Sequence, residues 1–574
     1  MTAELADLYT QLDENEIAQA NYLLQGSLVP AYQSLEFQLS TKMLLRTLGV
    51  VWDAGATAVD KNSQNTLFIE FDNSNKSTEV EQLYKQIGDI GLVTETVLEK
   101  LPRTSDVLTI RAVHEKLVAI AKESGAGSQE RKVALLSDLL KAVGPISGKF
   151  IARIVLGKLR LGFSIMTLLD ALSWAASGDK RYRPLLEDAY QKKADIGSLA
   201  DGFLRSRTQP DAIEVFLQSY NAAVGVPVVP ALCQRLNSAA EIIEKMGTVF
   251  VEPKYDGLRV QIHVGAVLDG VRSVQVFTRN LENATHMFPE LVALLSMIPG
   301  SAVFDGEAIG YDPLTGQLKS FQETITRKRK HDIAAVSESV PLRYYFFDVL
   351  VQDNVSLLHR PLRERKELLN NLIKQNEQFV ITEVTETTDP NTLKELHEHF
   401  LTEGLEGAVI KKVDSLYQSG RKGWSWVKIK EEEGTRGKLT DTLDLIVMGY
   451  YRGRGKRAQF GMGAFLVGVR DEVSDSIKTV AKIGTGISDE QLTTLRQLFD
   501  TEAVQVQPKQ FLVEKGLLPD VWISPSIVVE VAADEITKSP VHTAGVALRF
   551  PRLLKIREDK GYQDATTVIE LEQF

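Results

Sequence analysis

A lysine, an aspartate and a glycine stand close together in Lys254-Tyr255-Asp256-Gly257, and these residue types in this order can do covalent chemistry. The amine of a lysine becomes a nucleophile when its ammonium loses a proton, and burial or a neighbouring cation favours that loss. Gly257 permits a sharp turn that a side chain would obstruct. The motif predicts Lys254 as a covalent nucleophile, although a polar hairpin turn would produce the same four residues.

Carboxylates and further lysines follow downstream, beside short apolar runs. The segment Asp305–Glu307 places two carboxylates around a glycine, and Glu406 precedes another such run. Carboxylates that are buried together need a compensating cation, and Mg²⁺ prefers oxygen ligands that it shares with phosphates. Lys428 and Lys430 lie two apart, so in a strand they share a face and favour an anion such as phosphate between them. Taken singly, each fragment is more often a solvated turn or a charged sheet edge.

Three basic segments are candidates for contact with phosphates, and a solvated loop is the alternative for each. Lys158 and Arg160 stand beside two glycines, which let backbone amides approach a phosphate. The run Arg327–Lys330 is left open between the two interpretations. The third segment is a cationic loop that would follow backbone phosphates and holds Arg452, Arg454, Lys456 and Arg457.

The elements that must position these residues change in kind along the chain. Residues 1–222 show mainly helical periodicity, interrupted by two β-like runs at 49–52 and 66–71. Residues 223–432 alternate short β-like runs with short helices, and Pro227–Pro230 reads as a linker at their start. Residues 433–574 carry mostly short strands, and such a pattern suits a small barrel, with an OB-fold as the leading candidate. We therefore expect a multidomain protein with an all-α domain, an α/β domain and a C-terminal β-barrel.

Composition limits the class of protein without naming a function. The 574 residues carry a formal net charge of −10, which excludes a uniformly basic binder but not a protein with local basic grooves. The single cysteine, Cys233, excludes an intramolecular disulfide and a cysteine-based zinc site, and it fits a reducing compartment. No secretory signal and no apolar stretch of about 18 residues is visible, so we expect an intracellular protein without membrane contact.

The motifs at Lys254, Asp305–Glu307, Tyr345–Asp348, Glu406 and Lys428 resemble, in this order, those of the ATP-dependent DNA ligases of the archaeal and eukaryotic replicative type. These ligases belong to the superfamily of covalent nucleotidyltransferases. The resemblance covers nearly the whole chain, and six motifs in the right order are far more specific than any one alone. The remaining matches are the last motif, at Leu548–Arg552 with Arg557–Lys560, and the fragments Gly157–Gly162, Leu169–Leu172, Gly484–Gly486 and Ile536–Pro540.

The resemblance implies an enzyme that seals a nick between a 3′-hydroxyl and a 5′-phosphate in double-stranded DNA. ATP would transfer AMP to Lys254, the AMP would pass to the 5′-phosphate, and the 3′-hydroxyl would displace it. Covalent catalysis of this kind divides one hard displacement into easier ones. The implied metal is Mg²⁺, with Mn²⁺ as the alternative. A monomer in the cytoplasm of a prokaryote, associated with the nucleoid, would act in DNA replication, repair and recombination, with a sliding clamp as a candidate partner.

The same resemblance divides the chain into a helical DNA-binding domain at 1–222, an adenylation domain at 223–432 and an OB-fold domain at 433–574. It also assigns the residues that would bind the nucleoside. Glu252 would recognise the adenine amino group and Phe347 would stack on the base. Arg259 and Arg279 would contact ribose and phosphate. Glu307 would bind the ribose or assist metal binding.

Further residues would act on the metal and the phosphates. Glu406 would hold Mg²⁺, while Lys428 and Lys430 would grip the α-phosphate. The family commonly has an arginine where this chain has Lys422, and lysine lacks the fork that grips phosphate at two points. Whether the adjacent Arg421 replaces that fork stays open. The residues that would orient the departing pyrophosphate are Arg552, Asp559 and Lys560.

Two other functions share some of these features. An RNA ligase or a capping-type guanylyltransferase would use the same lysine, but the large helical region with its own fragments favours a DNA ligase. A scaffold that kept the fold and lost the chemistry would have little reason to retain the nucleophile together with the carboxylates and the motif lysines. A labelled nucleotide bound covalently to the protein separates the enzymes from the scaffold, and sealing of a nicked duplex with ATP or GTP separates the enzymes.

Overall fold

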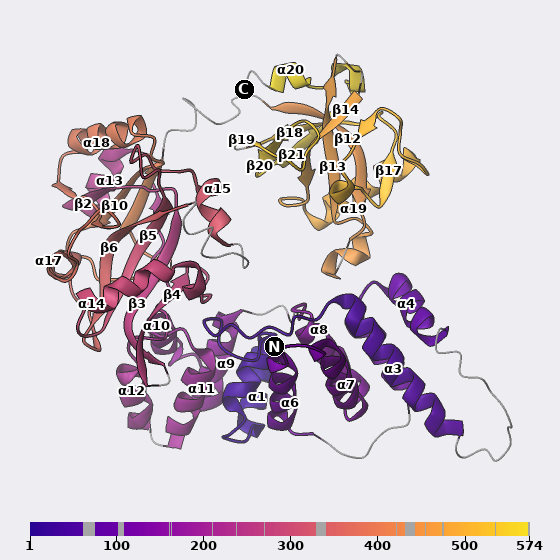
Figure 1. The fold of residues 1–574 in the computed structure, drawn as a ribbon, viewed down its shortest axis with the longest axis horizontal. Helices are drawn as coiled ribbons and strands as arrows, with labels where there is room; N and C mark the ends of the chain where they lie inside the picture. The colour runs from indigo at the N-terminus through magenta and orange to yellow at the C-terminus, as the bar shows by residue number, and fades with distance from the viewer. Residues whose placement is uncertain are drawn as a thin grey trace. The chain divides into compact units, whose positions relative to one another are not determined.

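The computed structural model of the chain contains two compact units, one of residues 1–81 with 90–430 and one of residues 82–89 with 431–574 (Figure 1). Every helix among the described residues is too short or too polar to span a bilayer. The structure describes residues 1–60, 75–101, 108–159, 161, 164–208, 210–236, 238–268, 270–328, 340–420, 422–430, 442–453, 455–472, 474, 476–533 and 535–571.

The N-terminal region is helical, and its helices pack through apolar stripes such as Leu168, Leu172, Leu199 and Phe203, all fully buried. Asp195 caps one helix through the N–H of Ser198. The helices are α1 (Thr2–Gln11), α2 (Ile17–Leu24), α3 (Thr41–Asp60), α4 (Asn75–Ile87), α5 (Ile90–Glu99), α6 (Ile110–Lys122), α7 (Ser128–Lys141), α8 (Pro145–Val155), α9 (Ile165–Ser177), α10 (Arg183–Lys192), α11 (Ile196–Arg205) and α12 (Pro210–Ser219).

The strand predicted at 49–52 was wrong, because these residues lie inside α3. Their β-branched pair suggested a strand, but the apolar residues Leu44, Leu48 and Val51 are fully buried at helical spacing, while Val50 is exposed. Burial of that apolar stripe therefore favours a helix over a strand at these residues. The second predicted strand, at 66–71, lies outside the described residues.

Two sheets form the α/β region. In the first the strand order is β1-β11-β10-β2-β9, and one face packs on α13 (Ala239–Met246) and α18 (Pro390–Thr402). The predicted strand at 426–430 and helix at 239–245 are confirmed, the helix with one more residue. The strands are β1 (Gln234–Arg235), β2 (Val249–Pro253), β9 (Thr385–Thr387), β10 (Gly407–Lys412) and β11 (Trp426–Lys430).

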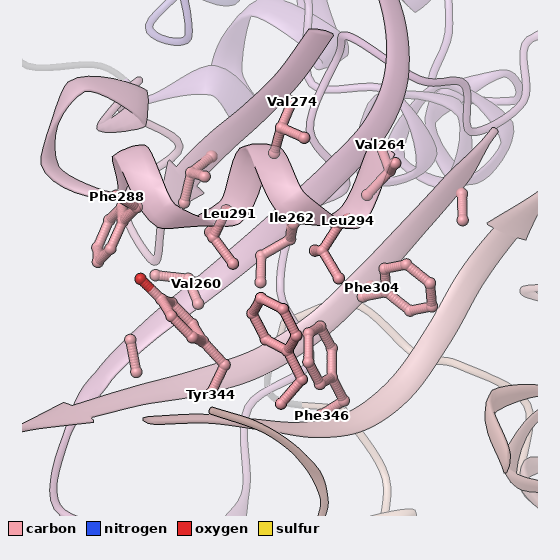
Figure 2. Close-up of a cluster of buried hydrophobic side chains, with 14 of the residues drawn as sticks. Val260, Ile262, Val264, Val274, Phe288, Leu291, Leu294, Phe304, Tyr344 and Phe346 are labelled. Carbon is pink, nitrogen blue, oxygen red and sulfur yellow. The ribbon is translucent and has the colours of Figure 1, made fainter. Parts of the chain in front are cut away.

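The second sheet has the order β4-β3-β5-β6-β7, with β8 paired to β6. Alternate residues of its central strands, including Ile262, Phe304 and Phe346, point toward α14 (Leu294–Met297) and the turn of helix before it (Figure 2). α17 (Leu362–Leu372) also packs here. The strands are β3 (Leu258–Leu268), β4 (Val271–Thr278), β5 (Ala302–Gly310), β6 (Leu342–Gln352), β7 (Val355–Ser356) and β8 (Phe379–Ile381).

The segment 227–230, expected as a linker, has no regular structure but is firmly packed. The N–H of Ala194 donates to the carbonyl of Pro227 (3.0 Å), and the Gln261 amide makes two hydrogen bonds with the backbone of Val228 (2.8 and 3.1 Å). Because Val228 is fully buried, its backbone polar groups need such partners. The segment therefore links the connection between α10 and α11 to β3.

The C-terminal unit is rich in strands. Its main sheet runs β15-β17-β12-β13-β14-β16, β18 joins β12 to β21, and β19 pairs with β20. Its core is apolar and includes the buried face of α19 (Asp489–Thr501), which was predicted at 489–499. The strands are β12 (Leu443–Tyr451), β13 (Ala464–Asp471), β14 (Ser476–Ile483), β15 (Ala503–Val504), β16 (Phe511–Leu512), β17 (Val521–Ile523), β18 (Val528–Ala532), β19 (Glu535–Lys538), β20 (Val546–Arg549) and β21 (Arg552–Ile556).

Candidate active site

Lys254 directly follows β2, where the chain passes the start of β10. Its N–H donates to the carbonyl of Gly407 (2.9 Å), and the N–H of Glu406 donates to the carbonyl of Lys254 (3.1 Å). Gly407 has a φ of +124°, a backbone conformation that favours glycine. The Lys254 ammonium forms an ion pair with the Glu406 carboxylate, and both side chains are partly exposed. The predicted nucleophile thus stands beside a carboxylate at the edge of the sheet.

Gly257 allows two strands to approach closely. A Cβ placed on this residue would lie 2.6 Å from Cγ1 of Ile309 and 2.7 Å from the carbonyl oxygen of Ala308. No side chain fits at such distances, so the glycine lets the start of β3 lie against β5. Any larger residue would push the Lys254 segment away from β5.

Cross-strand pairing brings the motif lysines to the face that carries the nucleophile. Glu252 of β2 is aligned with Lys428 of β11 through the strand between them. Two positions nearer to Lys254, Gly407 stands opposite Lys430. Directly paired residues in antiparallel strands share a face. Lys428 and Lys430 therefore occupy the same face of β11, as predicted.

The Lys254 ammonium interacts electrostatically with the carboxyl groups of Asp256, Glu307 and Glu406. Burial raises the pKa of Asp256, the nearby Glu406 adds to this rise, and Lys254 opposes it. Burial raises the pKa of Glu307 to about 8, against the opposing charges of Arg259 and Lys254. Clustered carboxyls behave in this way because each disfavours ionisation of the next. No cluster of three or more ligating side chains poised for a metal occurs within the described ranges, so a metal here would also need oxygens from substrate or water.

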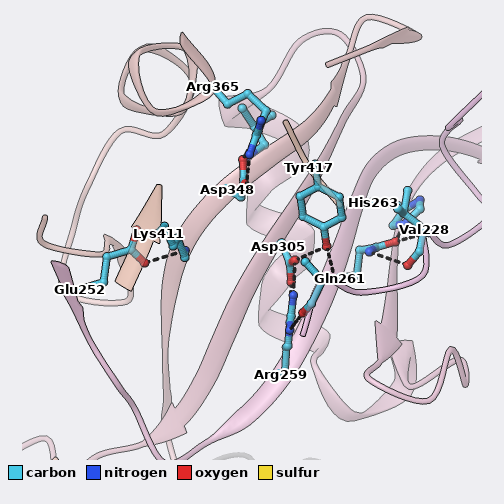
Figure 3. A network of polar contacts seen from close by, with 12 residues as sticks. Val228, Glu252, Arg259, Gln261, His263, Asp305, Asp348, Arg365, Lys411 and Tyr417 are labelled. Carbon is cyan, nitrogen blue, oxygen red and sulfur yellow. Dashed lines mark hydrogen bonds and ion pairs between the residues drawn. The ribbon is translucent and has the colours of Figure 1, made fainter. Parts of the chain in front are cut away.

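Arg259 on β3 is held by a two-point ion pair. Its Nε and Nη2 donate to the carboxylate of Asp305 (3.0 and 2.6 Å), and Nη1 donates to the carbonyl of Ala231 (2.6 Å). Tyr417 donates its hydroxyl to the same carboxylate (2.8 Å; Figure 3). Three of the five N–H groups of Arg259 are thereby used inside the protein, and two remain for a ligand.

Glu252 lies in a buried ion cluster. Lys366 of α17 approaches its Oε1 (2.6 Å), and Lys411 of β10 donates to its Oε2 (2.7 Å; Figure 3). The Lys411 ammonium also lies over the rings of Phe347 (4.3 Å to the centroid) and Trp426 (4.2 Å). Lys366, Lys411 and Trp426 were not among the predicted site residues. Lys411 is nevertheless visible in the sequence as a lysine that ends the apolar run after Gly407.

Phe347, predicted to stack on adenine, is surrounded by cations in this structure. The Arg259 guanidinium lies 5.5 Å from its ring centroid, in addition to the Lys411 ammonium. Two residues earlier on the same strand, Tyr345 stacks on Tyr255 with ring centroids 4.0 Å apart. Phe347 thus lies beside the buried ion cluster of Glu252, Lys366 and Lys411.

Two predicted phosphate-binding residues lie apart from the carboxyl groups. Arg279 is exposed on the turn that follows β4. Lys422 forms an ion pair with Glu187 of α10 (2.6 Å) and a longer hydrogen bond with Gln191 (3.4 Å). The neighbouring Arg421 lies outside the described residues, as does the side chain of Lys430.

The predicted pyrophosphate residues belong to the C-terminal unit. Asp559 is paired with Arg557 (2.7 Å), and its carboxylate is exposed. Arg557 keeps the pKa of that carboxyl well below its usual range. Lys560 is paired with Asp444 (2.7 Å) at the start of β12. Arg552, the first residue of β21, is exposed.

The predicted phosphate-contact residues divide by exposure. Lys158 and Arg452 are exposed, and Arg160, Arg454 and the side chain of Lys456 lie outside the described residues. Arg457 donates from Nη1 to the carbonyls of Gly463 and Gly484, and so it braces the turn.

The run at 327–330 begins with a residue that phosphate cannot reach. Arg327 is 4% exposed. Its guanidinium is bound by the carboxylate of Glu290 (2.6 and 2.8 Å). The interpretation of Arg327 as a phosphate contact is therefore wrong.

Comparisons with known proteins agree along the chain. The descriptions of three matching family models are "DNA ligase N terminus" over residues 1–173, "ATP dependent DNA ligase domain" over 230–430 and "ATP dependent DNA ligase C terminal region" over 458–560. A "Probable DNA ligase" of Dictyoglomus thermophilum is 40% identical over 99% of this chain and 92% of its own length. A "DNA ligase 2" of Thermofilum pendens is 36% identical over 100% of this chain and 93% of its own.

Proposed function

Because this chain belongs to the family of ATP-dependent DNA ligases, we propose that it seals nicks in duplex DNA through an AMP group held covalently on Lys254. In the first step the Lys254 amine attacks the α-phosphorus of ATP, an N–P bond forms, and the bond to pyrophosphate breaks. An oxygen of the 5′-phosphate at the nick then attacks the same phosphorus and releases the lysine. The 3′-hydroxyl finally attacks the 5′-phosphorus and expels AMP.

The observation that carries this proposal is the environment of the Lys254 amine. The amine lies against Glu406, a carboxylate that can accept the proton lost before attack. Lys428 and Lys430 stand on the same face of the sheet, where cations would stabilise the charge that develops on the α-phosphate. A nucleophile, a base and a cationic surface are thus available in one place.

The carboxyl groups fit a divalent cation. Glu406 and Glu307 are the proposed ligands, and oxygen donors of this kind suit Mg²⁺, with Mn²⁺ as the alternative. The raised pKa values of Glu307 and Asp256 support the fit, because a cation among these groups would favour their ionised forms. When bound, the metal would neutralise phosphate charge. The chain itself positions the nucleophile and accepts its proton.

For the nucleoside we propose contacts that use the free hydrogen-bonding capacity of the site. Glu252 accepts from the adenine amino group, because a carboxylate offers about four acceptor positions and the hydrogen bond from Lys411 uses one of them. Phe347 contributes to the base-binding wall. Arg259 uses its two remaining N–H groups on the ribose or phosphate, and Arg279 approaches from the adjacent turn.

The other phosphate contacts need side chains that can change partners. Lys422 contacts phosphate once it leaves Glu187, and its exposed position supports that exchange. Arg552, Asp559 and Lys560 orient the departing pyrophosphate in the first step only. Lys158 and Arg452, both exposed, contact the DNA backbone. The same role is proposed for Arg160, Arg454, Lys456 and Arg457.

The finer architecture and the cellular role are part of the same proposal. We assign residues 1–222 to an all-α DNA-binding domain, 223–432 to an adenylation domain and 433–574 to an OB-fold. The enzyme would act as a monomer in replication, repair and recombination. Docking on a sliding clamp stays a prediction.

A labelling experiment tests the chemistry. Wild-type protein, Lys254→Ala and the matched variant Lys412→Ala are incubated with α-labelled ATP and Mg²⁺, and a nicked duplex is added to a parallel set. Lys412 is an exposed lysine on β10, so its loss removes a charge without touching the site. We expect acid-labile label on the wild type and on Lys412→Ala, and none on Lys254→Ala, which should still bind the nick. Label retained by Lys254→Ala would overturn the assignment.

A further inference from the structure

The buried cluster around Glu252 holds more positive than negative charge. Glu252, Lys366 and Lys411 are 2%, 5% and 1% exposed, and two ammonium groups face one carboxylate at 2.6 and 2.7 Å. Buried charges are expensive unless they are paired, so one lysine would be enough to neutralise Glu252. The second cation needs another explanation.

Two cations on one carboxylate have consequences for its orientation. Each oxygen is fixed by a different element, since Lys366 comes from α17 and Lys411 from β10. Lys411 is itself held by Phe347 and Trp426. The carboxylate therefore cannot rotate without breaking an ion pair.

Because its carboxylate is fixed in this way, Glu252 accepts hydrogen bonds from a defined direction. It lies two residues before the nucleophile in the sequence. Adenine carries an amino group at position 6, which donates. Guanine carries a carbonyl oxygen at this position. Its partial negative charge would be repelled by the carboxylate. A rigid, buried acceptor discriminates well between such groups, because the wrong partner leaves it without a hydrogen bond.

We propose that Lys366 and Lys411 are positioning residues that hold the Glu252 carboxylate oriented toward the 6-amino group of the base, and so set the preference for adenine. The inference rests on the proposed function, in which Glu252 reads the base. Neither lysine touches the reacting atoms. Their contribution is to the recognition of one group on the substrate.

The test compares two nucleotides that differ in that group alone. Self-adenylation is measured with ATP and with purine riboside 5′-triphosphate, which lacks the 6-amino group, for wild type, Lys411→Met and Lys366→Met. We expect the wild type to prefer ATP in kcat/KM by about 10- to 100-fold, the range for one hydrogen bond to a charged group. In each variant the ratio should fall to about 3-fold or less, mainly through a higher KM for ATP.

Two controls separate positioning from a loss of structure. Lys412→Met, on the exposed neighbour, should keep the wild-type ratio. Binding of a nick that carries no adenylate involves no base recognition, so Lys411→Met should bind it as tightly as the wild type if its fold is intact. Lys411→Arg, which restores a cation between Phe347 and Trp426, should recover part of the ratio.

The outcomes are distinct. A variant that loses activity with both nucleotides by one common factor, and so keeps the ratio, would show that the lysines are structural only and would overturn the inference. A wild-type ratio near one would overturn the base contact of Glu252 and the inference with it. Absence of any label on wild-type Lys254 would instead overturn the proposed function.

Discussion

Charged residues are arranged in two different ways in this molecule. In the α/β region Asp348 and Arg365 are fully buried and bind each other at two points (2.8 and 3.0 Å). In the C-terminal unit Asp559 is 66% exposed, and it shares Arg557 with carboxylates of other strands. A buried pair is expensive to break, whereas an exposed one exchanges partners readily. The first arrangement suits residues that fix a site, and the second suits residues that meet a ligand for one step.

The largest expected effect comes from breaking a buried pair on one side. Asp348→Ala leaves the guanidinium of Arg365 buried without its counter-ion, and such a loss destabilises by about 3–5 kcal/mol. Denaturant unfolding of the full chain should show a transition at clearly lower denaturant. The matched variant Asp559→Ala should unfold like the wild type. If the two variants were destabilised equally, the proposed difference between the buried ion pair of the α/β region and the exposed carboxylate of the C-terminal unit would be wrong.

A selective effect on one step is expected from Lys560 in the C-terminal unit. Lys560→Ala removes a cation that we assign to the departing pyrophosphate, while Asp444 keeps Arg557 as a partner. Self-adenylation should fall at least 10-fold more than sealing of a pre-adenylated nick, a factor that corresponds to about 1.4 kcal/mol. Parallel single-turnover measurements of the two reactions provide the comparison. If both steps slow equally, Lys560 does not act on pyrophosphate.

A further effect, on stability and not on rate, concerns pH and Glu307. Its pKa is about 8 in the folded protein and about 4.5 when unfolded, so the folded state binds more protons between these values. The resulting stability is present below pH 4.5 and is lost as pH rises toward 8. Glu307→Gln removes this loss, so the variant should gain stability relative to wild type from pH 5 to pH 8, on the order of 1–2 kcal/mol. The melting temperatures of the two proteins are measured from pH 5 to pH 8 without added metal. A difference in melting temperature that did not change with pH would contradict this prediction.

Local pattern predicted those features that depend on neighbours in sequence. The strand at 426–430, the helix at 489–501 and the shared face of Lys428 and Lys430 follow from periodicity and propensity. At 49–52 the same reasoning failed, because packing of a helical stripe outweighed the preference of two valines for strands. The order of helices and strands can thus be predicted from local sequence. The exceptions are segments whose secondary structure is determined by tertiary contacts.

Charge partners could not be predicted in this way. Lys411 meets Glu252 across 159 residues, and Lys422 meets Glu187 in a different region of the chain. Arg327 looked like part of a solvated basic run and is buried on Glu290. A lysine or arginine read from sequence carries no sign of whether a carboxylate from elsewhere will bind it. The roles of Lys254, Glu406 and the motif lysines remain predictions that rest on the family and on their common face.

The most direct measurement is the mass of the protein after incubation with ATP and Mg²⁺ in the absence of DNA, followed by mapping of the modified peptide. We expect one added adenylate on the ε-nitrogen of Lys254, which disappears when a nicked duplex is supplied. Strand joining by protein that never carries an adenylate at this position would contradict it.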